Sequence, residues 1–370
     1  MSDAAPPALG GEREAPTRSS AARSKAEEGR MRALSLVGDR KIELVDMAAP
    51  PAPTAGEVQI AIKAIGLNHI DVWGWRGMAF AKRKLPLVAG AEAAGEIAAV
   101  GPDVDHFKAG DRVVMYGALT CGACRACREG RDNLCEDVKG LMGFHVDGFA
   151  REFVNLPARL VIPVPAGVDF PDAACAPIAF STVEHMLFDN AKLEPGETIL
   201  VHAGGSGIGT VAIQMAKAVD CTVITTVGDE GKAEKARTLG ADHVINYRTD
   251  RFEHAVRKLT AKGGVDVVFE HVGADTFSGS LLSLKRGGRL VTCGATSGPT
   301  VTLNLMQLFQ QQYRIFGSFG ASIRNVRDSL AKIAAGMKPV IDTEVALADF
   351  ARGLERLESR QVFGKIIVRF

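Results

Sequence analysis

The sequence predicts an α/β protein in two parts, an N-terminal β-barrel-like part and a C-terminal doubly wound parallel sheet. Its 370 residues suggest two domains of ordinary size. From Met31 to about Phe153, short β-like runs are broken by glycine and proline, whereas from about Pro177 apolar runs of four to six residues alternate with helical segments. The first pattern is typical of antiparallel or barrel-like sheets and the second of a parallel sheet.

The composition argues against several classes of partner. The chain has 44 Lys and Arg against 43 Asp and Glu, so no excess of charge favours nucleic acid or an anionic membrane surface. No apolar run approaches the roughly 20 residues that cross a bilayer, and no apolar signal core is visible near the N-terminus. We therefore expect a cytoplasmic protein.

Residues 1–30 are expected to form a disordered tail, because apart from alanine only Met1 and Leu9 are apolar there. Met31 is an alternative natural start. We assign residues 31–165 together with 320–370 to the barrel-like domain, with a cysteine-rich lobe at 121–135. Residues 166–319 are assigned to the domain of the parallel sheet.

The expected elements follow from these runs in chain order. The barrel-like part should have strands at 58–65, 95–100 and 112–115, and the segment 363–368 should return to it as a last strand. Six apolar runs are expected to form the parallel sheet: Thr198–Val201, Thr222–Thr226, His243–Ile245, Val265–Phe269, Leu290–Thr292 and Ile315–Phe316. Six strands is the count of a full dinucleotide-binding sheet.

A glycine-rich loop directly follows the first of these six strands. Glycine lets backbone approach a pyrophosphate closely, and free N–H groups at the start of the next helix, from about Gly209, favour negative charge. We interpret His202 as a packed loop residue. The predicted contacts to a dinucleotide are Gly204, Gly205, Ser206, Gly207, Ile208 and Gly209.

The end of the second strand bears on the choice of cofactor. An acidic residue that binds the adenosine ribose is expected about 20 residues after the glycines, yet Val227 occupies that place. Lys232 favours a 2′-phosphate and Asp229 would repel one. We assign both side chains to the cofactor site and predict NADPH, with NADH as the alternative.

The ends of the fourth, fifth and sixth strands should line the same cleft, because ligands of open parallel sheets bind outside the carboxyl ends of the strands. The predicted lining residues are Val272, Cys293, Gly294, Ala295, Phe316, Gly317 and Ser318. Cys293 is interpreted as an inert packing residue rather than a reactive thiol.

Four of the seven cysteines form a cluster in the pattern Cys-x2-Cys-x2-Cys-x7-Cys: Cys121, Cys124, Cys127 and Cys135. Four thiolates suit a structural zinc, which leaves no coordination position for water or substrate. An iron–sulfur cluster is the alternative, but the last interval is wider than in the bacterial ferredoxin run and no proline follows. We predict one structural Zn²⁺ per chain.

Together these features resemble the medium-chain dehydrogenase/reductase superfamily. Besides the cysteine lobe and the glycine loop, the resemblance rests on Gly-Asp-Arg-Val at 110–113, Gly-Gly-Arg-Leu at 287–290 and Phe-Gly-Lys at 363–365, and it covers about residues 31–370. It implies a GroES-like barrel with a Rossmann domain, a small-molecule substrate, and a homodimer or homotetramer. It also implies that Thr182 packs on the nicotinamide and that Lys365 reaches a cofactor phosphate or holds the domains together.

The resemblance has one departure that decides the expected chemistry. Alcohol dehydrogenases of the superfamily hold a catalytic zinc at three positions that are occupied here by Asn68, Ala91 and Ile178. None of these side chains replaces the cysteine or histidine ligands, so no catalytic zinc is expected. A metal-free site suits hydride addition to an activated alkene, because the charge spreads into an enolate that hydrogen-bond donors can stabilise.

The resemblance to quinone oxidoreductases and enone reductases assigns roles around the nicotinamide. Asn68 would donate its amide to the substrate oxygen, Asp71 would orient the loop, and His69 is a candidate proton donor. For each of these, a purely structural role is the competing interpretation. Trp73, Phe144 and His145 are the aromatic residues expected to line the substrate pocket.

We therefore predict an NAD(P)H-dependent reductase of an enone, enal, enoyl thioester or quinone. A zinc-independent alcohol dehydrogenase is one alternative, and a cofactor-binding scaffold without turnover is another. Cofactor binding without hydride transfer to any acceptor would favour the scaffold.

Overall fold

The computed structural model describes residues 29–78 and 83–370. Most of the predicted disordered tail, 1–30, lies outside the described residues, although Arg30 already begins the first strand. The predicted domain limits remain a proposal, and the sheets are described below as they stand.

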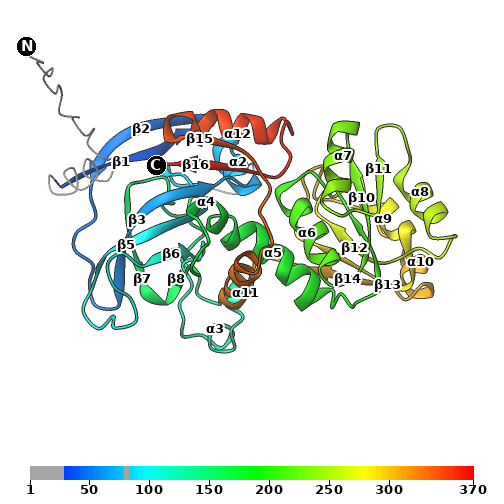
Figure 1. Cartoon of the computed structure of the whole chain (residues 1–370), viewed down its shortest axis with the longest axis horizontal. Coiled ribbons are helices and arrows are strands. Elements are labelled where there is room, and N and C mark those ends of the chain that lie inside the picture. Colours follow the sequence, from blue (N-terminus) through cyan, green and yellow to red (C-terminus); the bar gives the residue numbers. More distant parts are fainter. Residues whose placement is uncertain (1–28, 79–82) are drawn as a thin grey trace, which may run out of the picture.

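The first part of the chain, joined by two C-terminal strands, forms two largely antiparallel sheets (Figure 1). A small sheet has the order β2-β1-β4, with β1 (Arg30–Gly38), β2 (Lys41–Ala48) and β4 (Leu87–Val88). A larger sheet has the order β15-β16-β3-β5-β6-β8, and β7 also pairs with β3. Its strands are β3 (Glu57–Gly66), β5 (Glu92–Val100), β6 (Arg112–Met115), β7 (Phe153–Pro157), β8 (Val161–Pro163), β15 (Ile341–Ala346) and β16 (Lys365–Arg369).

The strand β16 confirms the expected return of the chain to the first part. It pairs antiparallel with β3, with Val368 opposite Ile65, and parallel with β15. Apolar side chains at Ile366, Ile367 and Val368 are fully buried there. Both faces of β16 are therefore covered, with Ile367 in one apolar cluster and Ile366 and Val368 in another. A slip of one residue would exchange these side chains between the two clusters.

The second part contains the predicted parallel sheet, in the order β11-β10-β9-β12-β13-β14. All of its neighbouring strands are parallel, and the order is that of a doubly wound dinucleotide-binding fold. The strands are β9 (Thr198–Val201), β10 (Thr222–Val227), β11 (His243–Asn246), β12 (Val265–Glu270), β13 (Leu284–Thr292) and β14 (Arg314–Gly317). Their cores are fully buried, as at Ile199, Leu200 and Val201.

Helices cover both faces of this sheet and the junction between the two parts (Figure 1). The helices are α2 (His69–Arg76), α3 (Arg125–Arg128), α4 (Phe170–Ala173), α5 (Ser181–Glu184), α6 (Gly207–Lys217), α7 (Glu230–Thr238), α8 (Phe252–Leu259), α9 (Phe277–Ser283), α10 (Leu305–Gln310), α11 (Ile323–Ala334) and α12 (Phe350–Glu358). Two π-helical segments, Ala176–Phe180 and His185–Asn190, flank α5.

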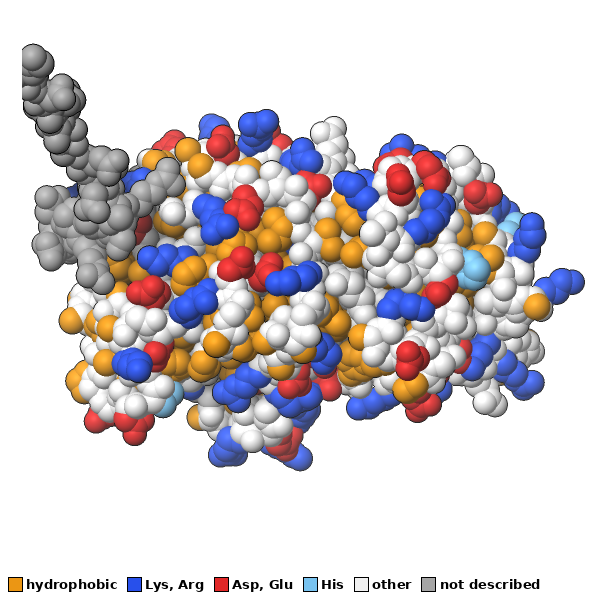
Figure 2. All heavy atoms as spheres, in the orientation of Figure 1, with side chains coloured by type: hydrophobic (Ala, Val, Ile, Leu, Met, Phe, Trp, Pro, Cys, Tyr) orange, Lys and Arg blue, Asp and Glu red, His pale blue; other side chains and the backbone are white. Residues whose placement is uncertain are grey.

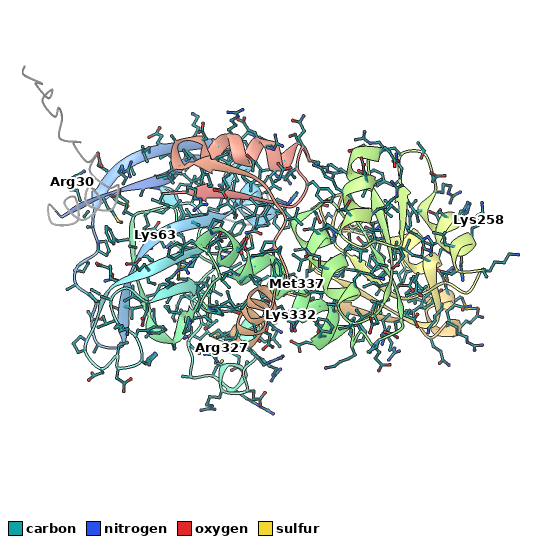
Figure 3. All side chains as sticks on the ribbon, viewed as in Figure 1. Arg30, Lys63, Lys258, Arg327, Lys332 and Met337 are labelled. Carbon is teal, nitrogen blue, oxygen red and sulfur yellow. The ribbon has the colours of Figure 1, made fainter. Side chains whose placement is uncertain are left out.

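The junction is packed by α5 and α11. Figure 3 shows Lys332 and Met337 between the two parts, and Lys332 donates to Glu184 of α5 at 3.0 Å. A single apolar cluster includes Phe180 and Val183 from this region, Val201 from β9 and Leu330 from α11. The two parts therefore share a core at this point.

The surface carries both signs of charge. Figure 2 shows Lys and Arg side chains interspersed with Asp and Glu over the visible face, in agreement with the near-zero net charge. Within residues 29–78 and 83–370, every helix is too short or too polar to cross a lipid bilayer.

Candidate active site and metal centre

The glycine-rich loop joins β9 to α6 and is shaped by close contacts. Ser206 caps α6, because its Oγ accepts from the backbone N–H of Gly209 at 2.9 Å. A Cβ at Gly205 would lie 3.0 Å from the Phe363 ring, and one at Gly207 would lie 2.9 Å from Cδ of Lys365. The loop therefore needs glycine where the segment 363–365 packs against it.

A cavity of about 900 Å³ lies in front of this loop, between the two parts. It is open along the carboxyl ends of β9, β10 and β12, where ligands of such sheets bind. Fourteen of the sequence-predicted residues line it: Asn68, His69, Trp73, His145, Thr182, Gly205, Ser206, Gly207, Ile208, Lys232, Val272, Cys293, Gly294 and Lys365.

Other predicted residues lie around this cavity rather than in its lining. Gly204 and Gly209 support the loop from below, since a Cβ at either would overlap Thr225 or Ala203. A neighbouring cavity of about 850 Å³ shares Cys293 and Gly294 with the first. The predicted residues that line only this second cavity are Ala295, Gly317 and Ser318.

Outside the cysteine lobe, four further predicted residues line neither cavity: Asp71, Phe144, Asp229 and Phe316. Asp71 is a buried residue in the first turn of α2, and Phe316 lies in β14. Phe144, expected in the substrate pocket, is 6% exposed and its Cδ2 would lie 3.4 Å from a Cβ on Gly74. It packs under α2, because the tight approach at Gly74 leaves room for its ring there. Its expected place in the pocket is not what the structure shows.

The three positions that would hold a catalytic zinc come together in the cavity lining as Asn68, Ala91 and Ile178. Lys365 reaches the same place, where its Nζ donates to Asn68 Oδ1 at 2.7 Å and to Glu92 Oε1 at 2.5 Å. The other oxygen of Glu92 accepts from the backbone N–H of Ile178 at 2.7 Å. An ammonium and a carboxylate thus form a buried ion pair beside the former ligand positions.

This ion pair changes the predicted roles of two residues. The Asn68 amide donates to Glu92 Oε1 at 2.8 Å and to the carbonyl of Gly66 at 3.2 Å, so both of its hydrogens are used within the protein. The Lys365 ammonium donates its third hydrogen bond to the carbonyl of Leu67 at 2.8 Å. In this arrangement Asn68 orients Lys365 rather than offering a donor to substrate. The three hydrogen bonds of the Lys365 ammonium all lie within the barrel-like part, so they do not join it to the parallel sheet.

Asp71 fits its predicted role of orienting the loop. Its carboxyl accepts from the backbone N–H of Asn68 at 2.8 Å and of Ala91 at 2.9 Å, so it joins the start of α2 to the strand β5 region. Burial raises the pKa of Asp71 to about 7, against the lowering effect of these hydrogen bonds and of Lys365.

Two histidines remain as donors toward substrate. Burial, with the nearby charges of His271 and Arg360, lowers the pKa of His69 to about 4, so its ring is neutral at pH 7. His145 Nδ1 accepts from the backbone N–H of Leu141 at 3.2 Å, which places its ring proton on Nε2. A neutral imidazole N–H from either residue can donate to a developing oxyanion.

The end of β10 is more basic than the sequence pattern suggested. The Asp229 carboxylate is turned to the backbone N–H of Lys232 at 2.8 Å, as the cap of α7. Burial lowers the pKa of Lys232. The carboxylates of Asp229 and Asp342 oppose this lowering, and the cations Arg248 and Arg360 add to it. Sequence reasoning missed both arginines, although Arg248 follows the third strand closely.

Tyr247 is a further residue at this end that the sequence analysis missed. Its Oη would lie 2.6 Å from a Cβ at Gly228, and Arg248 Nε would lie 3.6 Å from the same point. Tyr247 and Arg360 line the large cavity. Tyr247 and Arg248 could have been found from the sequence, because they closely follow the predicted third strand of the parallel sheet.

A buried network shapes the turn after β12. Glu270 accepts from the backbone N–H groups of Val272 at 2.7 Å and Gly273 at 3.1 Å, and from Ser280 Oγ at 2.7 Å. Burial acts to raise the pKa of Glu270, but its donors outweigh this and hold the pKa below the usual value. His202 lies beside Ser280 at 2.9 Å, and burial lowers the pKa of His202 to about 4. His202 therefore packs as a neutral side chain and still lines the cavity.

The four clustered cysteines form a candidate metal centre. Their Sγ atoms all lie within 4.8 Å of one another, with 3.6 Å between Cys135 and Cys121 and 4.0 Å between Cys121 and Cys127. Tetrahedral zinc with Zn–S bonds of about 2.3 Å separates its sulfurs by roughly 3.8 Å. Backbone N–H groups of Ala123 and Cys124 lower the pKa of the Cys121 thiol to about 6, which favours a thiolate. The donor set fits zinc.

Comparison with known families supports the same reading of the chain. The family model described as alcohol dehydrogenase GroES-like domain matches residues 54–166. The family model described as zinc-binding dehydrogenase matches residues 207–335. These matches fall on the barrel-like part and on the parallel sheet.

Named relatives and a solved structure extend the comparison over most of the chain. A quinone oxidoreductase of Salmonella typhimurium is 33% identical over 332 residues, covering 86% of this chain and 93% of the relative. An acryloyl-coenzyme A reductase of Metallosphaera sedula is 31% identical over 343 residues, covering 91% and 99%. The crystal structure of an NAD-dependent alcohol dehydrogenase superposes with a TM-score of 0.87 at 38% identity, covering 92% of this chain and all of that chain.

Proposed function

Because the chain belongs to the medium-chain dehydrogenase/reductase superfamily and is a nicotinamide-dependent oxidoreductase with zinc-binding dehydrogenase sequence, we propose that it reduces activated alkenes or quinones without a catalytic metal. The substrate class would be an enone, an enal, an enoyl thioester or a quinone. The observation that carries the proposal is the ion pair of Lys365 and Glu92 at the three former ligand positions.

The donor set at that place is unsuited to a zinc ion. An amide, a methyl group and an aliphatic chain stand where thiolate and imidazole ligands are needed. Both oxygens of Glu92 are already engaged, one by Lys365 and Asn68 and the other by the backbone N–H of Ile178, so this carboxylate is not free to bind a divalent cation. Reduction of an isolated ketone, which gains most from a Lewis acid, is therefore disfavoured relative to conjugate reduction.

A bound nicotinamide supplies hydride to the β-carbon of the alkene or to the quinone ring. The chain's residues hold the substrate and its developing negative charge. We assign the oxyanion donors to the neutral rings of His69 and His145, which line the cavity. Trp73, whose ring lies 6.1 Å from that of His69, would form the apolar side of the substrate pocket.

We further propose NADPH as the preferred cofactor, with NADH as the alternative. Lys232, Arg248 and Arg360 gather at the carboxyl end of β10. Of the two carboxylates near Lys232, Asp229 caps α7, and Asp342 accepts from Arg356 and from the backbone N–H of Phe363. A 2′-phosphate would gain charge-assisted hydrogen bonds there. A cytoplasmic location remains a prediction from the sequence.

The experiment that tests the reaction is oxidation of NADPH and of NADH by the purified protein. The acceptors would be a small enone, an enal, a quinone and a simple ketone, each with and without prior treatment with a chelator. Turnover of the enone, enal or quinone that survives chelation is expected. Activity confined to the ketone and lost on chelation would contradict the metal-free site, and silence with all four would favour a scaffold.

We also propose a homodimer formed through α10 and β14. The outer edge of β14 is unpaired within the described chain, and Leu305, Met306 and Phe309 on α10 expose 65%, 56% and 61% of their surface. An exposed apolar helix beside an open sheet edge is a common association surface. A second copy, with the same edge and the same apolar helix, is the simplest complementary partner.

A further inference from the structure

The segment 318–323, which follows β14, forms one side of the large cavity through Phe319, Gly320 and Ala321. Asn325 of α11 accepts from Ser322 within it, and four further side chains from outside the segment form hydrogen bonds to it. Tyr116 donates to the carbonyl of Ala321 at 2.5 Å, and Asn190 donates to Ser318 Oγ at 3.1 Å. The remaining two come from the four-cysteine lobe.

Those two residues are neighbours in the short helical turn 132–134, between the third and fourth cysteines. Asp132 Oδ2 accepts from the backbone N–H of Ile323 at 3.1 Å, at the start of α11. Asn133 Nδ2 donates to the carbonyl of Phe319 at 2.9 Å. The turn is fixed to the metal centre, because the backbone N–H of Cys135 donates to the carbonyl of Asp132 at 3.1 Å.

The amide of Asn133 is held in this orientation by a second contact. Its Nδ2 lies 3.3 Å from His185 Nε2, and His185 Nδ1 lies 2.9 Å from Asp189 Oδ2. A carboxylate accepts only, so the ring proton is on Nδ1 and Nε2 accepts from Asn133. Asp189 also accepts from Arg324 of α11 at 2.7 Å.

We propose that Asn133 is a positioning residue that joins the four-cysteine lobe to the side of the cofactor cavity, so that order in the lobe sets the conformation of residues 318–321. The inference rests on the proposed function, because it takes this cavity as the cofactor site. A structural metal in the lobe then acts on cofactor affinity through the contacts that Asn133 and its neighbour Asp132 make with this segment. The contribution of the lobe to cofactor affinity can therefore be measured separately from its contribution to the stability of the whole protein.

The test compares Asn133→Asp with Arg128→Ala in the full-length zinc-loaded protein. Asn133→Asp keeps the shape but replaces the donor with an acceptor that faces the Phe319 carbonyl. Because Asn133 also lines the cavity, Asn133→Leu, which removes the donor without adding a charge, is measured beside it and should raise the Kd for NADPH to a similar extent. Arg128 is an exposed residue of α3 in the same lobe, so its loss controls for a general effect of substitution there. Zinc content, Tm, the Kd of NADPH and the KM and kcat with an active acceptor are measured for each.

We expect Asn133→Asp to keep its zinc and a Tm close to that of Arg128→Ala, while its Kd for NADPH rises about fivefold or more. Equal affinities in Asn133→Asp and Arg128→Ala would overturn the proposal. Loss of zinc or a larger fall in Tm in Asn133→Asp would also overturn it, because Asn133 would then support the lobe itself. Failure of the unsubstituted protein to bind NADPH or NADH would overturn the cofactor cavity as well, and is distinguishable from either result.

Discussion

Of the single residues described above, Lys365 and Glu92 are those whose substitution is expected to destabilise the protein most. Their side chains are 3% and 0% exposed. Removing one partner leaves the other charge buried without compensation, whereas replacing both is far less costly. The pair therefore serves to position the residues around it. Its net contribution to the free energy of unfolding is expected to be small.

We expect Lys365→Met to lower the free energy of unfolding by about 3–5 kcal/mol, and Lys365→Met combined with Glu92→Gln to recover most of that loss. Urea unfolding of both variants measures this. Lys338→Met is the control, since Lys338 is 73% exposed in its pair with Asp172 and should cost less than about 1 kcal/mol. Equal losses in the single and double variants would contradict the buried pair.

Asp71 and His69 give opposite pH dependence to stability. The pKa of Asp71 is raised by burial from 3.8 to about 7, so the folded state holds this proton more tightly and stability falls as pH rises from about 4 to 7. The pKa of His69 is lowered by burial from 6.5 to about 4, so stability falls as pH drops through that window.

The free energy of unfolding, measured between pH 4.5 and 7, should reveal the two signs. Relative to the unsubstituted protein, Asp71→Asn should gain stability as pH rises, and His69→Asn should gain it as pH falls. The limiting slope for one proton is about 1.4 kcal/mol per pH unit. Parallel profiles for all three proteins would show that neither group titrates differently on folding.

At the scale of elements, the carboxyl ends of β10 and β11 together form the predicted phosphate site. Lys232→Ala and Arg248→Ala should each raise the KM for NADPH about tenfold while leaving the KM for NADH nearly unchanged, because only NADPH carries the 2′-phosphate. Arg237→Ala, on the exposed face of α7, is the matched control. A similar rise for both cofactors would assign these cations to the shared pyrophosphate or to structure.

Helices and strands were predicted well where neighbouring residues in the sequence determine them. All six parallel strands were expected, and α6 begins at Gly207, two residues before the expected start, because Ser206 caps it. β13 begins at Leu284 rather than Leu290, since its first residues already pair with β12 at Val265. The two π-helical segments were not predicted, because an apolar run does not distinguish helical periods.

The candidate site was predictable only where a motif carries it. The loop 204–209 and the four cysteines were found from spacing, whereas the use of Asn68 by Lys365 depends on residues nearly 300 positions apart in the chain. No sequence motif marks Asp132, Asn133 or Arg360 as part of the site. Their roles arise from contacts that only the folded chain creates.

At the scale of the whole molecule, α10 and β14 predict the assembly. Phe309→Glu should convert a dimer to a monomer, because a charge would be buried in the apolar contact. Sedimentation velocity at micromolar concentration measures the change. Leu44→Glu, a 51% exposed leucine of β2 in the other part, should leave the dimer intact. A monomer before any substitution would show that this surface serves another purpose.

The strand β16 has a consequence for the order in which the protein can fold during synthesis. The barrel-like sheet is complete only when β15 and β16 pair beside β3, and Lys365 must find Glu92 across 273 residues of chain. Closing so long a loop slows folding and leaves earlier strands exposed while the ribosome makes the parallel sheet. We therefore expect the first part to depend on chaperones until residues 341–369 have emerged, even though the parallel sheet, contiguous in the chain, can fold before them.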